Sequence, residues 1–302
     1  MSLRTCALNL DQSRREMQSQ GTADFPCAGY KTHRAGRSEE EIPWHYHEEM
    51  ELLMISEGTL TVNVPGNEMV LEAGDGIWIN SGVLHSARAV SDCGFRTLVF
   101  SPLLVSGSVD SAISRKYIEP LTKCKSILYS CLSEKEPEQS GFFTEFGNAF
   151  AALEEDKFGY EILVRGFLSR LCLYFRGKYA DMLETDNGAP PIDVARARKM
   201  LDYIHANPGE NLRLADLAGI VNISPREALR CFQRVLRISP IQYALKYRVM
   251  RSADELSREP GKSVQMIAEQ FGFESSSYYT KLFRRYTRCT PTEYRKMKME
   301  QS

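Results

Sequence analysis

Apolar and polar positions in the C-terminal third of the chain follow one pattern that occurs twice. In each copy an apolar residue and an alanine, at 217–218 and again at 267–268, are followed by Asn222 or Gly272. Asparagine and glycine tolerate the left-handed backbone of a tight turn, and an amphipathic stretch follows each of them. Each copy therefore predicts a helix, a tight turn and a second helix.

Three segments in this region begin with the same helix-starting sequence. Residues 224–227, 239–242 and 290–293 each carry Ser or Thr, then Pro, and Glu or Gln at the fourth position. The hydroxyl and the carboxylate or amide satisfy backbone amides at a helix N-terminus, and proline at the first helical position loses no hydrogen bond. Helix starts are therefore expected at these three points.

The second helix of each motif is predicted to bury one face and to expose the other. At about 100° per residue, the exposed sides carry these residues: Arg226, Arg230, Gln233 and Arg237 in the first copy, and Ser277, Lys281, Arg284 and Arg288 in the second. A run of charges is usually a solvated face. Two such faces at matching places in two helix-turn-helix motifs favour nucleic-acid binding instead.

The spacing of the two motifs, the turn at 272–275 and the ending at 290–295 resemble the C-terminal DNA-binding domain of AraC-type transcription regulators. The resemblance implies two recognition helices in successive major-groove segments, joined by a long linker helix at residues 240–257. The family's base-facing positions and the two stripes give the predicted DNA-binding residues: Arg226, Arg230, Gln233, Ser276, Ser277, Lys281 and Arg284. Leu229 stands where polar residues are often found, which leaves direct readout by the first helix to its arginines.

Charge is divided unevenly along the chain, although the net charge is only −1. Residues 192–302 hold 20 Lys and Arg against 12 Asp and Glu, whereas residues 1–191 hold 18 against 27. A basic C-terminal module on an acidic remainder suits a DNA-binding domain attached to a part that does not touch DNA.

Cysteine usage and hydropathy give the expected compartment. The eight cysteines include no CxxC pair, so neither a zinc nor a disulfide framework is expected, and free thiols fit a reducing cytosol. No apolar run reaches membrane-spanning length, and the N-terminus lacks the apolar stretch of a signal peptide. We therefore expect a cytoplasmic protein with no membrane partner.

Residues 22–106 show short β-like runs separated by turn residues. The expected strands lie at 50–56, 60–64, 69–71, 77–79 and 96–100. Short strands at this spacing predict an antiparallel jelly roll or barrel. Residues 1–21 are polar and unpatterned, and no structure is assigned to them.

Four polar residues of this β region are candidates for one site. On a strand, His45, His47 and Glu51 have the same parity and point to one face. His85 follows another expected strand and adds a third imidazole. The set resembles the three histidines and one glutamate of the cupin superfamily, because His-x-His, three residues, Glu, six residues and Gly58 match its first motif.

The second cupin motif is matched more loosely, with Asn80 where Pro is usual and Ala89 where Asn is usual. Three imidazoles and a carboxylate suit a divalent first-row metal such as Fe, Mn, Ni or Zn. The same groups also suit a metal-free lining for a polar ligand. Trp78 is included in the expected effector pocket as a ring that stacks on a flat ligand, although an aromatic residue in a small barrel is more often core.

Residues 107–180 are expected to be a helical dimerisation or support region. Within 161–178, apolar residues recur at three- and four-residue steps: Val164, Leu168, Leu171 and Phe175. This stripe either forms a dimer seam with its copy or packs on the barrel. Residues 181–191, rich in Gly and Pro, are the expected interdomain linker before a DNA-binding domain at 192–298.

The expected fold is α+β with two domains: an N-terminal antiparallel β jelly-roll or cupin barrel followed by helices, and a C-terminal all-α tandem helix-turn-helix domain. The expected function is a ligand-responsive, sequence-specific DNA-binding transcription regulator, often an activator. Its expected partners are double-stranded DNA, a small-molecule effector such as a sugar or other polar metabolite, RNA polymerase and a second copy. No cofactor is required, and a divalent transition metal in the barrel is the remaining candidate.

Two rival functions stay open. The first is a metal-dependent cupin enzyme fused to a DNA-binding domain, although no residue is convincingly placed as an acid or base beside the four candidate ligands. The second is a constitutive architectural DNA binder with a vestigial barrel.

Overall fold

The computed structural model describes residues 20–299 except 23, 36–41 and 186–191. Contacts divide the described chain into two compact units: the first ends before Ile192, and the second begins at Ile192. The expected N-terminal segment and interdomain linker lie mostly outside the described residues, although the start of that linker belongs to helix α5 (Ala180–Thr185).

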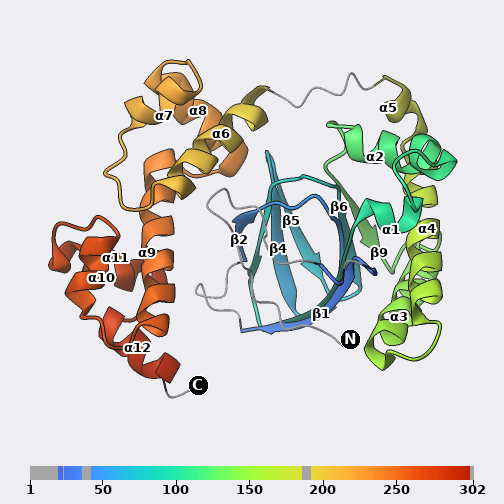
Figure 1. Ribbon diagram of the computed structural model, residues 1–302, viewed down its shortest axis with the longest axis horizontal. Helices are drawn as coiled ribbons and strands as arrows, with labels where there is room; N and C mark the ends of the chain where they lie inside the picture. The colour runs from blue at the N-terminus through green and yellow to red at the C-terminus, as the bar shows by residue number, and fades with distance from the viewer. Residues whose placement is uncertain (1–19, 23, 36–41, 186–191, 300–302) are drawn as a thin grey trace. The chain divides into compact units, whose positions relative to one another are not determined.

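The first unit is built on two antiparallel β-sheets (Figure 1). Their strands are β1 (Cys27–Arg34), β2 (Ile42–His45), β3 (Met50–Glu57), β4 (Thr59–Val64), β5 (Asn67–Glu72), β6 (Asp75–Ile79), β7 (His85–Ala89), β8 (Cys93–Phe100) and β9 (Tyr129–Ser133). The five-stranded sheet has the order β1-β8-β3-β6-β9, and the four-stranded sheet has the order β2-β7-β4-β5. This arrangement confirms the predicted N-terminal antiparallel β fold.

The two faces of the five-stranded sheet pack against different partners. Alternate residues of a strand point to opposite faces, and on β3 both sets are buried. Leu53 and Ile55 join the core between the two sheets. Leu52 and Met54 face the other way and join a core formed with helices.

Helices cover that outer face of the five-stranded sheet (Figure 1). They are α1 (Pro102–Ser106), the π-helix η1 (Ser114–Ile118), α2 (Glu119–Lys123), α3 (Ser140–Glu155) and α4 (Tyr160–Lys178). The apolar stripe of α4 settles an alternative that the sequence left open. Val164, Leu168, Leu171 and Phe175 are each 0 % exposed and belong to the core shared with the sheet, so the stripe packs on the barrel.

One part of the helical region is a strand. Residues 107–180 were expected to be helical, but β9 pairs with the edge of β6 in an antiparallel register from Ile79↔Tyr129 to Asp75↔Ser133. Ser130 and Leu132 are buried while Cys131 is exposed, an alternation that fits a strand. The hydrogen bonds of an open sheet edge, rather than local propensity, decide the structure here.

The second unit is all-helical, as predicted. Its helices are α6 (Ile192–Ala206), α7 (Leu214–Ile220), α8 (Pro225–Leu236), α9 (Pro240–Arg258), α10 (Val264–Gln270), α11 (Ser276–Thr287) and α12 (Pro291–Met299). Helices α8, α9 and α12 begin at the three helix-starting sequences, where Ser224, Ser239 and Thr290 each accept a hydrogen bond from the backbone amide three residues on.

Both predicted turns have the left-handed backbone that their residues allow. Asn222 has φ 50° between α7 and α8, and Gly272 has φ 72° between α10 and α11. At Gly272 the chain also passes directly against the carbonyl of Gly209, so a side chain would collide with it. Among the described residues, no helix has the length and apolar character needed to cross a membrane.

Candidate DNA-binding surface and polar β-sandwich site

Helix α8 presents one polar face and buries the other. Ala228 and Phe232 are fully buried, and the ring of Phe232 meets that of Tyr243 on α9 edge to face at 5.8 Å. Arg226, Arg230 and Gln233, all three predicted DNA-binding residues of this helix, are exposed. Packing of the apolar face therefore fixes the direction in which the polar face points.

One arginine of α8 is engaged within the protein. Arg234 forms an ion pair with Asp193 at the start of α6 and a longer one, 3.8 Å, with Glu227. Arg230 has no ion pair among the described residues. The guanidinium of Arg230 is therefore available to an outside partner, while that of Arg234 holds α6 and α8 together.

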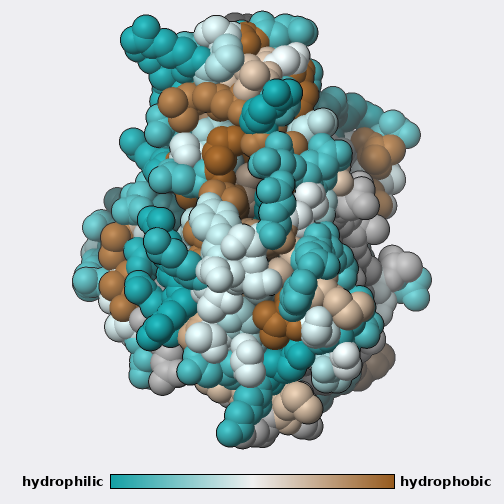
Figure 2. All heavy atoms as spheres, turned by 90° about the vertical axis from the view of Figure 1, so that its left-hand side faces the viewer, coloured by the Kyte–Doolittle hydropathy of each residue, from teal (hydrophilic) through white to brown (hydrophobic). Residues whose placement is uncertain are grey.

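Helix α11 repeats the arrangement in the second motif. Tyr279 and Phe283 are fully buried, and their rings pack at 5.5 Å. The predicted residues on this helix are all exposed: Ser276, Ser277, Lys281 and Arg284. The surface that contains α10 and α11 is dominated by hydrophilic side chains (Figure 2).

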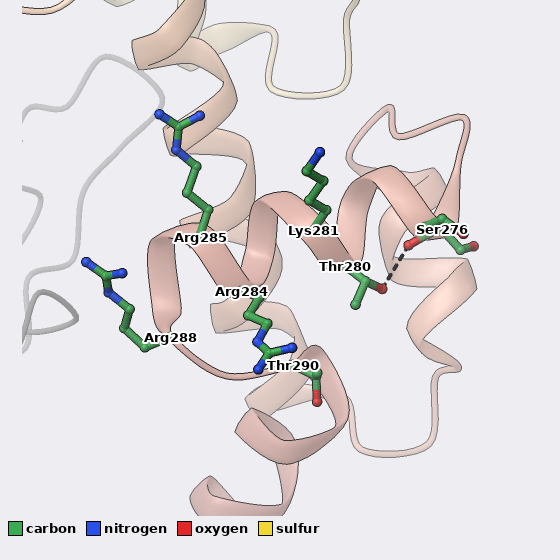
Figure 3. Close-up of a pocket in the computed structure, with 8 residues that line it drawn as sticks. Ser276, Thr280, Lys281, Arg284, Arg285, Arg288 and Thr290 are labelled. Carbon is green, nitrogen blue, oxygen red and sulfur yellow. Dashed lines mark hydrogen bonds between the residues drawn. The ribbon is translucent and has the colours of Figure 1, made fainter.

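A basic concavity lies along α11 (Figure 3). All four predicted residues of the helix line it, together with Arg288, which ends the helix in a left-handed conformation. Thr280 and Arg285 line it as well, and the sequence pattern missed both because they lie beside the predicted stripe. Four cationic side chains around one concavity suit the phosphates and base edges of DNA.

A single helix connects the two motifs. The 19-residue α9 packs on the first motif through Tyr243, whose ring meets that of Phe232 on α8. The hydroxyl of Tyr243 also contacts Nε2 of His205 on α6 at 2.8 Å. Near the other end of α9, the hydroxyl of Tyr279 donates to Ser252 at 3.0 Å within the core of the second motif. Because both motifs are anchored on one helix, the exposed faces of α8 and α11 have a fixed spacing.

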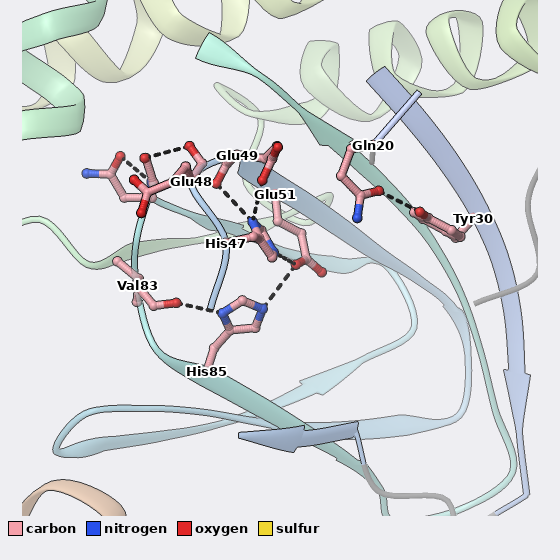
Figure 4. Close-up of polar contacts among 10 residues, drawn as sticks. Gln20, Tyr30, His47, Glu48, Glu49, Glu51, Val83 and His85 are labelled. Carbon is pink, nitrogen blue, oxygen red and sulfur yellow. Dashed lines mark hydrogen bonds and ion pairs between the residues drawn. The ribbon is translucent and has the colours of Figure 1, made fainter. Parts of the chain in front are cut away.

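The four polar residues predicted in the β domain come together between the two sheets. Figure 4 shows three of them, His47, Glu51 and His85. Glu51 comes from β3 in one sheet, and His45 and His85 are opposite each other on β2 and β7 in the other. His47 follows β2. All four side chains are buried, and one candidate ligand atom from each lies within 4.8 Å of the others.

Each imidazole is oriented by a backbone carbonyl. The Nδ1 atoms lie 2.8 Å from the oxygen of Pro43 for His45, 3.1 Å from that of Glu49 for His47, and 2.8 Å from that of Val83 for His85. A carbonyl oxygen only accepts hydrogen bonds, so Nδ1 carries the proton in each ring. This is the tautomer that leaves Nε2 available as a metal ligand.

The Nε2 atoms of two rings face the same carboxylate oxygen. Oε2 of Glu51 lies 3.3 Å from His47 and 3.1 Å from His85. A neutral ring protonated at Nδ1 has only a lone pair at Nε2, and a carboxylate oxygen only accepts. These contacts therefore call for a cation, which is either a second proton on a ring or a metal ion held between the groups.

Burial and neighbouring groups shift the pKa values of Glu51 and His45. Burial acts to raise the pKa of Glu51, but hydrogen bonds and electrostatic interactions with His47 and His85 outweigh it and hold that pKa well below its ordinary value. Burial, together with those same two imidazoles, holds the pKa of His45 well below its ordinary value. Glu51 is thus ionised and His45 neutral, as metal ligands must be.

Trp78 does not lie in this site, and the prediction that it lines the effector pocket is wrong. It pairs with Leu52 rather than Glu51, so its side chain points to the outer face of the sheet. There it is 1 % exposed and stacks on Phe175 of α4 at 4.2 Å. The bulky ring is part of the core beneath α4.

Comparisons with known proteins identify both domains and several relatives of the chain. A family described as a cupin domain matches residues 37–101, and one described as a helix-turn-helix domain matches residues 217–297. An uncharacterized HTH-type transcriptional regulator, YdeC of Bacillus subtilis, is 28% identical over 95% of this chain and 98% of its own. The HTH-type transcriptional activator RhaR of Mannheimia succiniciproducens is 24% identical over 84% of this chain and 87% of its own.

A third relative matches the C-terminal part. The regulatory protein PocR of Salmonella typhimurium is 34% identical over 119 residues, which are 39% of each chain. The resemblance seen in the sequence is confirmed for both domains, and the homologues are DNA-binding transcription regulators. The chain therefore combines a cupin domain with a helix-turn-helix domain, and over nearly its whole length it is similar to HTH-type transcription regulators.

Proposed function

We propose that α8 and α11 enter two adjacent major-groove segments of one operator, and that an effector bound between the β-sheets controls this DNA binding. The observation that supports it most directly is the pair of exposed polar faces, one on each second helix, fixed on a common α9. Neutralisation of phosphates by several Lys and Arg makes operator affinity fall steeply as salt rises. A DNA-binding regulator works beside the chromosome, so the proposal places it in the cytoplasm.

Replacing Arg230 by alanine tests the base-reading role of α8. A bidentate arginine–guanine contact contributes about 1–3 kcal/mol of discrimination, so Arg230→Ala should flatten base preference by roughly 5- to 150-fold at one or two positions of the half-site. Lys281→Ala should do the same about one DNA turn away. Binding to a randomised operator library, read by sequencing, measures both effects.

Arg234→Ala is the matched control, because it also removes an arginine side chain from α8. Arg234 already forms an ion pair with Asp193. The effect of this substitution on affinity should be small and equal for all sequences. An equal loss over all sequences in Arg230→Ala would make Arg230 a phosphate contact and would contradict its assigned role.

The polar site between the sheets is the proposed effector site. An effector that binds one arrangement of the protein more tightly than another shifts DNA affinity by that difference, because coupling between sites is a free energy. His45, His47, Glu51 and His85 suit a polar metabolite such as a sugar. Contact with RNA polymerase and an activating role complete the proposal, and transcription from the operator by purified polymerase tests them.

The donor set also fits a divalent first-row metal. Four buried ligand atoms lie within 4.8 Å of one another, and a backbone carbonyl accepts the Nδ1 proton of each imidazole. The Nε2 lone pairs of His47 and His85 face the acceptor Oε2 of Glu51. All three features favour a bound cation. When bound, such an ion would supply a Lewis-acidic centre for an oxygen of the effector. Turnover of candidate substrates by the metal-loaded protein would instead favour the cupin enzyme as the function of this domain.

We also propose that the outer face of α4 forms a homodimer seam. The inner stripe is buried, but Ile162 and Leu173 are 71% and 58% exposed. Gly166 and Ser169 lie between them at helical spacing, and small residues let a second helix approach closely.

Leu173→Glu should convert the dimer into a monomer, because it places a charge in this apolar seam. Sedimentation velocity measures the change. Val70→Glu is the control, since Val70 on β5 is equally exposed at 59% but lies away from α4. A dimer that survives Leu173→Glu would place the interface elsewhere.

A further inference from the structure

Strand β1 places polar side chains on the sheet face that packs against the second sheet. Thr32 pairs with Phe95, which in turn pairs with Ile55, and both apolar residues belong to the core between the sheets. Directly paired residues share a face, and alternate residues of a strand do as well. Tyr30, Thr32 and Arg34 therefore point toward the interior.

Three polar atoms in this part of the interior have no hydrogen-bond partner among the described residues. They are Nε2 of Gln20, Oγ1 of Thr32 and Nε of Arg34. Gln20 is 2% exposed and Thr32 is 9% exposed, and Oε1 of Gln20 accepts a 2.5 Å hydrogen bond from the hydroxyl of Tyr30. An unpaired buried polar group destabilises a fold, so three such groups in one part of the interior indicate a binding function.

Gln20 and Tyr30, at one end of this row of side chains, lie close to the histidine cluster, and Thr32 and Arg34 follow at increasing distance along β1. Ala28 pairs with Val99, which pairs with Glu51, so Glu51 lies in the row next to Tyr30. Two strand spacings separate β1 from β3, or about 10 Å. Figure 4 shows Gln20 and Tyr30 on the opposite side of Glu51 from His85.

We propose that Gln20, Thr32 and Arg34 form a second polar subsite that binds a carboxylate group of the effector. The proposal rests on the proposed function, in which the effector binds between the sheets. Gln20 and Arg34 offer N–H donors and Thr32 offers a hydroxyl, whereas a carboxylate only accepts. The guanidinium supplies the matching charge. The effector is then an organic acid whose carboxylate binds here and whose oxygen-bearing part extends along β1 toward the histidine cluster.

Saturation-transfer NMR on the full chain tests this subsite, with acetate as the carboxylate probe and acetamide as its uncharged counterpart. Acetate should receive saturation from the parent protein more strongly than acetamide does. Thr32→Val and Arg34→Gln should each abolish the acetate signal. Lys31→Gln is the matched control, since it removes one positive charge from the opposite face of the same strand.

Thermal unfolding separates binding from structure. Thr32→Val removes an unpaired hydroxyl, so the melting temperature should not fall. A lower melting temperature with unchanged acetate binding would show a structural role and overturn the proposal. Absence of an acetate signal in the parent, equal signals in all variants, or equal signals for acetate and acetamide would overturn it too.

The outcome for the subsite is distinguishable from that for the effector function. If acetate binding behaves as expected but damage to the histidine cluster leaves induction unchanged, the carboxylate subsite stands and the proposed effector control fails. If acetate fails to bind while the same damage abolishes induction, the effector control stands and this subsite is wrong.

Discussion

Gly272→Ala is expected to destabilise the second unit by about 2–4 kcal/mol. A left-handed backbone costs an L-residue about 1–2 kcal/mol, and the added Cβ would overlap the carbonyl of Gly209. The loop that carries Gly209 must then move, which adds strain of the size seen for the more damaging single substitutions. Urea unfolding of the full chain, followed by a probe in the second unit, gives the free energy of unfolding.

Gly219→Ala is the control for this substitution. Gly219 lies in α7 of the first motif, with no atom near the place of a new Cβ and without a left-handed backbone. Alanine should leave stability unchanged or raise it by up to about 1 kcal/mol, as expected in a helix. If both variants unfold at the same urea concentration, the close approach at Gly272 does not constrain the fold.

The parts of the fold that the sequence predicted are those whose signals are local. Ser239 and Gln242 satisfy each other's backbone amides within four residues, so the helix start can be recognised without knowledge of tertiary contacts. The same holds for the left-handed turn at Asn222. The four residues of the polar site were found because strand parity and motif spacing are also short-range properties.

The errors occur where long-range contacts decide the structure. Ile77, Trp78 and Ile79 are all buried, because one sheet face meets the other sheet and the opposite face meets helices. Such a strand has no polar side, so its sequence does not show which face Trp78 takes. Only the register with Leu52 places the ring under α4.

Gln20 shows a second kind of limit. Its burial depends on the hydrogen bond with Tyr30 of β1, and a single glutamine in a polar segment carries no pattern that predicts such a contact. The same is true of the unpaired hydroxyl of Thr32. A threonine on a strand is ordinary in sequence, and its significance appears only when the surrounding partners are known.

Replacing both His47 and Glu51 by alanine is expected to abolish effector-dependent induction while leaving operator binding intact. The variant removes two of the four clustered polar groups between the sheets, whereas the DNA-binding faces belong to a separate compact unit. Reporter expression with and without inducer, together with operator affinity of the purified protein, measures the two properties. Circular dichroism confirms that the variant is folded.

The chain offers a matched control for this double change. His33 and Glu57 form an exposed pair at 3.5 Å in the same domain, with side chains 61% and 65% exposed. Replacing both by alanine removes the same residue types and should leave induction unchanged. Any general effect of losing one histidine and one glutamate from the domain would appear in this variant as well.

Metal analysis of the same preparations decides the chemistry of the site. One equivalent of metal in the parent and none in the His47→Ala, Glu51→Ala variant would identify a metal centre, because two of four ligands are lost. A metal-free parent whose induction is still abolished by the double change would identify a polar ligand site, with protonated imidazoles balancing Glu51. Unchanged induction in that variant would remove the effector site altogether and leave the β domain as a dimerisation module.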